Sequence, residues 1–145
     1  MKKIIRKQLG EILVEGKLIT PENLKEALQV QKEKGGLIGQ ILVSLQYTTE
    51  EAIAQALTTQ YGFPYLPLAG YEIDPEVCRL IPEHVARQYE LIAVDRAGSV
   101  VTMAMSNPLN NAAVEDIEMI THCQVQVFVS TTTDINGAIK RTYKT

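Results

Sequence analysis

Histidines and cysteines, the side chains that most often bind metals or act as nucleophiles, are few in this sequence. The chain has two histidines, His84 and His122, and two cysteines, Cys78 and Cys123. His122 and Cys123 are adjacent, but two ligands cannot complete the tetrahedral shell of a zinc ion. The P-loop, GxGxxG, HExxH and GxSxG patterns are all absent from the sequence. We therefore expect no metal site, no catalytic residue and no enzymatic activity.

The remaining candidate groups have simpler structural explanations. Cys78 lies in an apolar stretch that is predicted as helix, where a thiol behaves as a small hydrophobic side chain. The carboxylate pairs Glu50-Glu51 and Glu115-Asp116 fall on predicted helices and are expected to face solvent.

Composition and charge narrow the class of protein further. The chain has 145 residues, of which 46% are hydrophobic, and a net charge of −3. This charge balance predicts no nucleic-acid partner, because such partners need a basic surface. The sequence contains no signal peptide and no run of about 18 apolar residues, so we expect a cytoplasmic protein with no direct membrane insertion.

A repeat organises the first part of the chain. Two windows of 24 residues, 8–31 and 37–60, align without a gap at an offset of 29. The identical pairs are Gly10/Gly39, Ile12/Ile41, Leu13/Leu42, Val14/Val43, Thr20/Thr49, Glu22/Glu51, Ala27/Ala56, Leu28/Leu57 and Gln31/Gln60. Only two copies are present, which indicates a duplicated helical hairpin and excludes a solenoid.

Four short helices are predicted to position these repeated residues. Apolar residues three or four apart predict a helix over 1–15, which ends at Gly16. Thr20-Pro21-Glu22 predicts the start of a second helix, which ends at Gly35-Gly36. The second window repeats this pattern as far as Gly62. Short connections between short helices predict two antiparallel hairpins packed together.

The pattern changes after the repeat. Residues 63–75 are rich in proline and glycine and are predicted as a linker. A helix pair over 75–80 and 82–89, strands over 91–95, 100–106 and 125–130, a helix over 111–121 and a last helix through Tyr143 are predicted next. The fold class is therefore α+β: a four-helix bundle over 1–62, a linker over 63–75, and a small α+β subdomain over 76–145 with about three strands.

The repeat and its five-residue spacer resemble the MshEN domain, the N-terminal module of type II secretion and type IV pilus assembly ATPases of the GspE/PilB kind. The matching residues are Leu9-Gly10, Leu13-Val14, Leu18-Ile19, Leu24, Leu28, Gln31, Gly39, Leu42-Val43, Leu57 and Gln60, with Ile38 and Ile53 as close substitutes. Segments 60–65, 80–82 and 103–110 resemble the second subdomain of the same family. The resemblance covers nearly the whole chain.

This resemblance implies a cyclic di-GMP binding domain in which each window takes half of the two-fold ligand. It implies glycines that let the backbone approach a phosphate, leucines that form a slot for guanine, and a glutamine that bonds a base edge or a phosphate. The implied ligand-binding residues are Gln8, Leu9, Gly10, Leu24, Leu28, Gln31, Leu37, Ile38, Gly39, Ile53, Leu57 and Gln60. No other cofactor is implied.

The sequence departs from the family pattern where charge matters most. The arginine that opens the motif is Gln8 in the first window and Leu37 in the second, and the motif's inner glycine is Lys17 and Gln46. Two charge-assisted contacts of about 1.5–3 kcal/mol each are lost, which predicts binding weaker by about two powers of ten or more.

Three hypotheses follow from the resemblance. The first is a docking module with a degenerate cyclic di-GMP site, which links an assembly ATPase to the cytoplasmic domain of an inner-membrane platform protein. The second is a functional cyclic di-GMP sensor that controls secretion or pilus assembly. The third is a free-standing regulator. A purely structural interpretation of the repeat makes Leu24, Leu28, Ile53 and Leu57 core residues.

Overall fold

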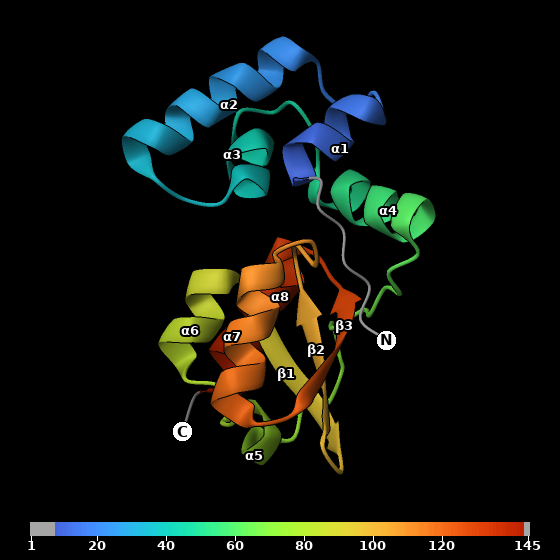
Figure 1. Cartoon of the computed structure of the whole chain (residues 1–145), viewed down its shortest axis with the longest axis vertical. Helices are drawn as coiled ribbons and strands as arrows, with labels where there is room; N and C mark the ends of the chain where they lie inside the picture. The colour runs from blue at the N-terminus through green and yellow to red at the C-terminus, as the bar shows by residue number, and fades with distance from the viewer. Residues whose placement is uncertain (1–7, 144–145) are drawn as a thin grey trace.

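The computed structural model describes residues 8–143 and shows a helical half stacked on a mixed half (Figure 1). The helical half consists of α1 (Leu9–Glu15), α2 (Pro21–Lys34), α3 (Ile38–Ser44) and α4 (Glu50–Tyr61). The helix predicted over 1–15 is present over Leu9–Glu15, and its first part, residues 1–7, lies outside the described residues.

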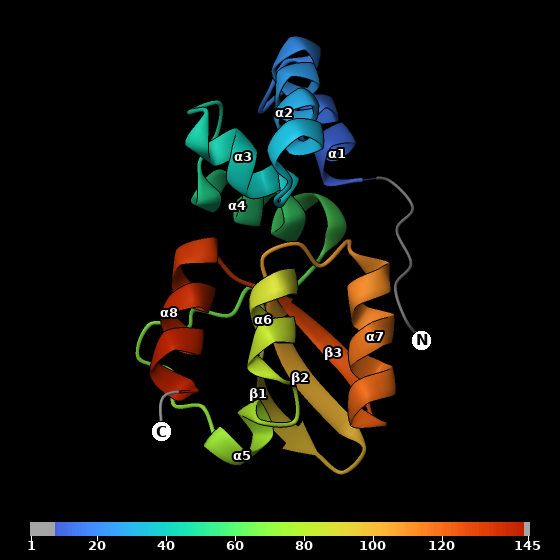
Figure 2. The ribbon, with the colours of Figure 1, turned by 90° about the vertical axis from the view of Figure 1, so that its left-hand side faces the viewer.

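The mixed half contains three strands and four helices among the described residues. They are α5 (Pro75–Cys78), α6 (Glu83–Tyr89), β1 (Leu91–Ala97), β2 (Val100–Met105), α7 (Asn111–Thr121), β3 (Gln124–Val129) and α8 (Thr132–Thr142). The sheet order is β1-β2-β3, with β1 antiparallel and β3 parallel to β2. Figure 2 shows α6, α7 and α8 in front of one face of the sheet. The α+β fold class predicted from the sequence is confirmed.

The two windows of the repeat begin their long helices in the same way. The Thr20 hydroxyl accepts the backbone N–H of Asn23 at 3.0 Å, and the Thr49 hydroxyl accepts that of Ala52 at 3.1 Å. Each threonine satisfies an amide that has no partner in the first helical turn, as the sequence predicts.

The two short helices also end in the same way. Lys17 after α1 and Gln46 after α3 have left-handed φ angles of 63° and 67°. The N–H of Leu18 bonds the carbonyl of Leu13, and the N–H of Tyr47 bonds that of Leu42, each at 3.0 Å. This pattern is a Schellman stop, which favours glycine at the left-handed position. It explains why the family motif has its inner glycine where this chain has Lys17 and Gln46.

Two apolar clusters hold the molecule together. The first joins the four helices of the repeat and includes Phe63, Leu109 and Val129, so the mixed half contributes to it. The second lies between the sheet and its helices and includes Leu68. Residues of the segment predicted as a linker are therefore buried in both clusters, and the boundaries at 62 and 75 stay a prediction.

Cys78 is buried in the second cluster, and burial raises the pKa of its thiol. Both properties fit the core role predicted for it and disfavour a nucleophile, which needs the thiolate. Among residues 8–143, no helix combines the length and the apolar character that a membrane span requires.

Candidate functional site

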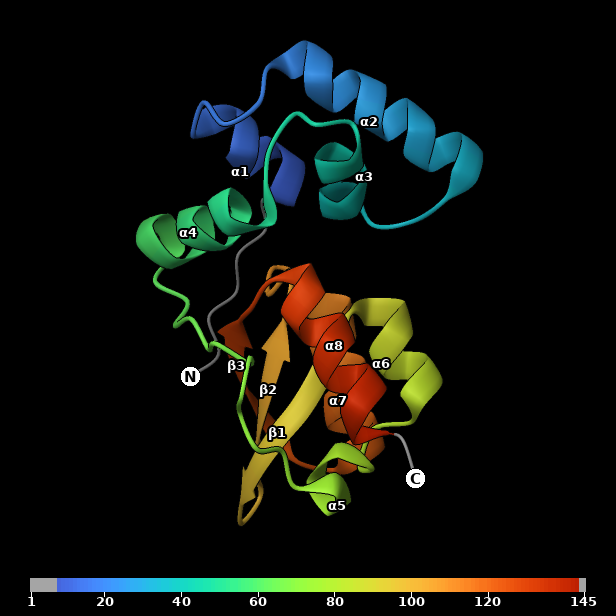
Figure 3. The same cartoon turned by 180° about the vertical axis from the view of Figure 1, so that it is seen from behind.

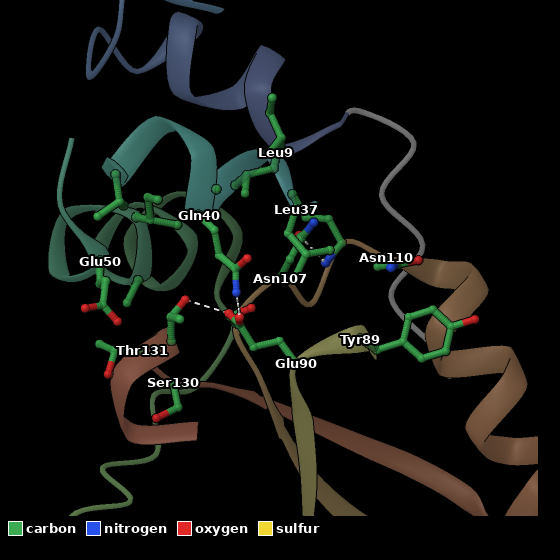
Figure 4. Close-up of a pocket in the computed structure, with 18 of the residues that line it drawn as sticks. Leu9, Leu37, Gln40, Glu50, Tyr89, Glu90, Asn107, Asn110, Ser130 and Thr131 are labelled. Carbon is green, nitrogen blue, oxygen red and sulfur yellow. Dashed lines mark hydrogen bonds between the residues drawn. The ribbon is translucent and has the colours of Figure 1, made fainter. Parts of the chain in front are cut away.

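A cavity of about 390 Å³ lies where the two halves of the molecule meet. Figures 2 and 3 show the first turn of α8 below α3 and α4, and the cavity opens at this junction. Figure 4 shows that its walls come from the repeat on one side and from the segments after α6, β2 and β3 on the other. Its volume is in the range of pockets that bind small ligands.

Seven of the twelve residues implied by the resemblance line this cavity. They are Gln8, Leu9, Gln31, Leu37, Ile38, Gly39 and Ile53. Both positions at which the family motif has arginine, Gln8 and Leu37, are among them. The fold thus gathers the motif residues of α3 and of the α1 N-terminus around one space, while their role as ligand contacts stays a prediction.

The other five implied residues lie elsewhere. Leu24 packs over Gly10, where an added Cβ would lie 2.5 Å from the Leu24 Cδ1 atom. Leu24 and Leu28 line a separate shallow depression on the outer surface of α2. Leu57 is fully buried in the core of the helical half, and Gln60 is exposed, with its amide next to Gly16. The absence of a Cβ atom at Gly10 therefore allows the Leu24 side chain to pack closely against α1.

Polar groups that the sequence analysis did not assign to a site line both walls. They include Gln40, Glu50, Tyr89, Glu90, Ser106, Asn107, Asn110, Asn111, Ser130, Thr131 and Thr132. The expectation that Glu50 faces solvent is wrong, because Glu50 is half-buried and bonds Thr133. Gln40 and Glu50 belong to the repeat, and the others belong to the mixed half. The sequence offered one signal for the others, since 103–110 belongs to a segment that resembles the family's second subdomain. Nothing in the repeat itself indicated that residues from the mixed half would complete the cavity.

Glu90 is the centre of a hydrogen-bond network that joins the two halves. Its side chain accepts a bond from the Gln40 amide of α3 and another from the Thr132 hydroxyl at 2.6 Å (Figure 4). The residue is 1% exposed and has a left-handed φ of 57°, a conformation that costs a non-glycine residue free energy. The left-handed angle ends α6, as it ends α1 and α3 at Lys17 and Gln46, so the feature that distinguishes Glu90 is a buried carboxylate bonded across the two halves.

A second carboxylate joins the halves beside it. Glu50, at the start of α4, accepts bonds from the backbone N–H of Thr133 at 2.5 Å and from its hydroxyl at 2.6 Å. Glu50 and Glu90 therefore hold consecutive residues in the first turn of α8. The positive end of a helix dipole suits carboxylates at this place.

The charge of the cavity is one-sided. Its described lining includes the carboxylates of Glu50 and Glu90 and no lysine or arginine. Tyr89 also lines it, and the hydrogen bond that its hydroxyl donates to Asp116 raises the tyrosine's pKa. Across residues 8–143, no group of three or more histidine, cysteine or acidic side chains could hold a metal ion.

Comparison with known proteins supports the family resemblance. The sequence model of the MshEN domain matches residues 61–145, more than half of the chain. The chain belongs to the MshEN domain family. The matched region starts after the second window of the repeat, so family membership rests on the mixed half and is independent of the repeat motifs.

Curated relatives extend the similarity over the repeat. The type IV pilus assembly ATPase PilB of Myxococcus xanthus is 33% identical over 136 residues, which cover 94% of this chain and 24% of that protein. The PilB of Thermus thermophilus is 32% identical over 139 residues, or 94% of this chain and 16% of that protein. The chain therefore spans about a quarter or less of the length of these relatives.

Two solved structures have the same fold as this MshEN family member. The structure of MshE with cdg has a TM-score of 0.70 and 27% identity, and it covers 95% of this chain and 100% of that one. The N-terminal domain of XpsE has a TM-score of 0.74 and 16% identity, with 99% of both chains covered.

Proposed function

We propose that this chain is a non-catalytic regulatory and docking module of a type II secretion or type IV pilus assembly ATPase. In this proposal it links the ATPase domain to the cytoplasmic domain of an inner-membrane platform protein, and it works in the cytoplasm at the membrane face. Two findings support the proposal. The relatives are pilus assembly ATPases of which the chain matches a small part, and the N-terminal domain of XpsE shares its fold.

The cyclic di-GMP site of the module is degenerate in this proposal. The observation that carries it is the charge of the cavity: Gln8 and Leu37 stand at the arginine positions, and Glu50 and Glu90 face the same space. Cyclic di-GMP brings two phosphate charges, so it would meet carboxylates without a compensating cation from the described lining. Such a pairing costs free energy because like charges repel and buried charges need partners.

A functional sensor is the second candidate. The structure of MshE with cdg, an abbreviation of cyclic di-GMP, is similar to this chain over that structure's full length, with 27% sequence identity. Seven implied residues lie around one cavity, and the apolar side chains among them suit the face of a base. For this candidate, apolar and backbone contacts would carry the binding energy that the motif arginines supply in the family pattern.

Titration calorimetry with cyclic di-GMP separates the two candidates. GTP and ATP serve as controls for general nucleotide binding. The degenerate site predicts no measurable heat for the natural sequence and at least a hundredfold gain in affinity for the double variant Gln8→Arg, Leu37→Arg. Micromolar or tighter binding by the natural sequence would overturn the degenerate site and establish the sensor.

The docking function has its own test. The purified chain is expected to retain the cytoplasmic domain of the platform protein from its own source in the absence of any nucleotide. A direct binding assay with both purified partners measures this. Absence of binding in that assay would contradict the docking function, whatever the result with cyclic di-GMP.

A further inference from the structure

Glu90 is a buried carboxylate whose charge is not matched by a cation among the described residues. Its side chain is 1% exposed and has two neutral hydrogen-bond donors, Gln40 and Thr132. Buried charges in proteins are normally paired, because the loss of hydration costs several kcal/mol per ion. An ionised carboxylate has about four lone-pair positions. Glu90 accepts two hydrogen bonds and Glu50 accepts two, so each carboxylate is able to accept more.

The first turn of α8 compensates this charge only in part. A helix N-terminus is equivalent to roughly half a positive charge, against the two carboxylates of Glu50 and Glu90. Among the described residues, the lining of the cavity therefore carries two carboxylates and no lysine or arginine, a balance that favours a cation. The motif positions that would bring arginine into this space have glutamine and leucine in this chain.

An independent feature of the cavity also points to a missing partner. Ser130 lines the cavity and is 1% exposed, and its Oγ atom has no hydrogen-bond partner among residues 8–143. Leaving a buried hydroxyl unpaired costs about 1–3 kcal/mol, so native structures seldom keep one without a reason. A ligand with several N–H donors would satisfy the free positions on the carboxylates, and a rotation of the Ser130 side chain would bring its buried hydroxyl to the same ligand.

We propose that the junction cavity receives the guanidinium group of an arginine presented by the protein partner of this module. The inference rests on the docking function proposed above and names the chemistry of the partner's contact. A guanidinium is favoured over an ammonium because it is planar, weakly hydrated and has five donors for separate acceptors. Its flat faces suit the apolar wall formed by Leu37, Ile38 and Leu109, and Tyr89 offers an aromatic ring at the same cavity.

N-acetyl-L-arginine amide is the probe for this assignment. Amide chemical shifts of the full chain are followed by NMR while the probe is added, with N-acetyl-L-citrulline amide as an uncharged analogue of the same shape. Saturable shifts are expected at Gln40 and at Ser130 to Thr132, with a dissociation constant on the order of millimolar, as for a single small group. Equal shifts with citrulline, or no saturable shift with arginine, would overturn the proposal.

Substitutions locate the contact. Glu90→Gln and Glu50→Gln keep the shape of each side chain and are each expected to weaken arginine binding at least tenfold. Glu51→Gln is the matched control, because Glu51 is exposed, follows Glu50 on α4 and does not line the cavity. Tighter binding of N-acetyl-L-lysine amide than of the arginine probe would refute the guanidinium assignment.

The same reagents separate this inference from the docking function. Binding of the platform domain is expected to weaken at least tenfold in Glu90→Gln and to be displaced by the arginine probe. If the platform domain binds the natural chain and Glu90→Gln equally, the docking function stands and the arginine contact is wrong. If the arginine probe binds and the platform domain does not, the cavity assignment stands and the proposed partner is wrong.

Discussion

The first window of the repeat, 8–31, and the second, 37–60, have similar sequences and similar helices but different surroundings. Leu28 of the first window is 46% exposed, whereas its counterpart Leu57 is fully buried. Glu11 of the first window faces solvent, whereas its counterpart Gln40 bonds Glu90 of the mixed half. The position of Pro21 corresponds to that of Glu50, which holds Thr133.

The two windows have the same local structure, including the threonine caps and the helix stops. Contacts with the mixed half give equivalent positions of the two windows different surroundings. A two-fold ligand would meet two equivalent half-sites only if both windows had the same neighbours. Here both windows contribute residues to the junction cavity, but only the second window bonds the mixed half through Gln40 and Glu50, and the first presents the outer face of α2. The following predictions test this inequality, from the largest expected effect to the smallest.

The largest difference between the two windows is expected at their equivalent leucines, because Leu57 is buried and Leu28 is exposed. Leu57→Ala is expected to lower the free energy of unfolding by about 2–5 kcal/mol, because it leaves a cavity in the core of the helical half. Leu28→Ala is expected to change it by about 0.5 kcal/mol or less, as for other exposed positions. Urea unfolding followed by circular dichroism measures both. An equal decrease in the free energy of unfolding for the two variants would show that Leu28 is buried in solution as well.

The contact between α3 and Glu90 predicts a second inequality. Gln40→Ala removes one of the two donors to a buried carboxylate and is expected to cost about 1–3 kcal/mol of unfolding free energy. Glu11→Ala, at the equivalent position of α1, is exposed and is expected to change stability by about 0.5 kcal/mol or less. The same unfolding assay compares them. If Gln40→Ala left the free energy of unfolding unchanged, the bond between Gln40 and Glu90 would not stabilise the junction of the two halves.

High pH provides a contrast between a tyrosine whose hydroxyl is part-buried, Tyr143, and one whose hydroxyl is exposed, Tyr47. The Tyr143 hydroxyl donates to the carbonyls of Cys78 and Ile81, and burial raises its pKa far above the ordinary value near 10. Because the folded pKa is raised, this stabilisation is complete below pH about 10 and is lost as pH rises further, by at most about 1.4 kcal/mol per pH unit before solvent screening.

Substitution of each tyrosine tests this pH dependence. Tyr143→Phe is expected to flatten the fall in unfolding free energy above pH about 10, since the ionisable group is gone. The bond to Glu26 raises the pKa of Tyr47, but the Tyr47 hydroxyl is exposed, so Tyr47→Phe should leave the profile almost unchanged. Urea unfolding at a series of pH values measures both profiles. Identical profiles for Tyr143→Phe and the natural chain would contradict the assignment.

The Schellman stops predict where the two windows should behave alike. Lys17→Gly and Gln46→Gly relieve a left-handed residue in each window, and each is expected to raise the unfolding free energy by about 0.5–1 kcal/mol. Thermal unfolding compares the two variants. A gain in one window and a loss in the other would show that tertiary contacts, rather than the local backbone, dominate at these ends.

Local features of the fold were predictable because nearby residues determine them. The threonine caps at Thr20 and Thr49, the helix stop at Gly62 and the helix over Asn111–Thr121 all follow from side chains within a few positions. The site was predictable only in part. Gln8, Leu37 and Gly39 line the cavity, whereas Leu24 and Leu28 lie on a different surface.

The sequence by itself determined the four repeated helices, the α+β class and the absence of the motif arginines, since pattern and identity contain this information. Only the tertiary structure decided that Glu90 and Glu50 meet Gln40 and the first turn of α8 around one cavity. The residues of these contacts lie 42 to 83 positions apart along the chain. Local propensity does not encode such contacts, because they arise when the two halves pack together and bury a charge between them.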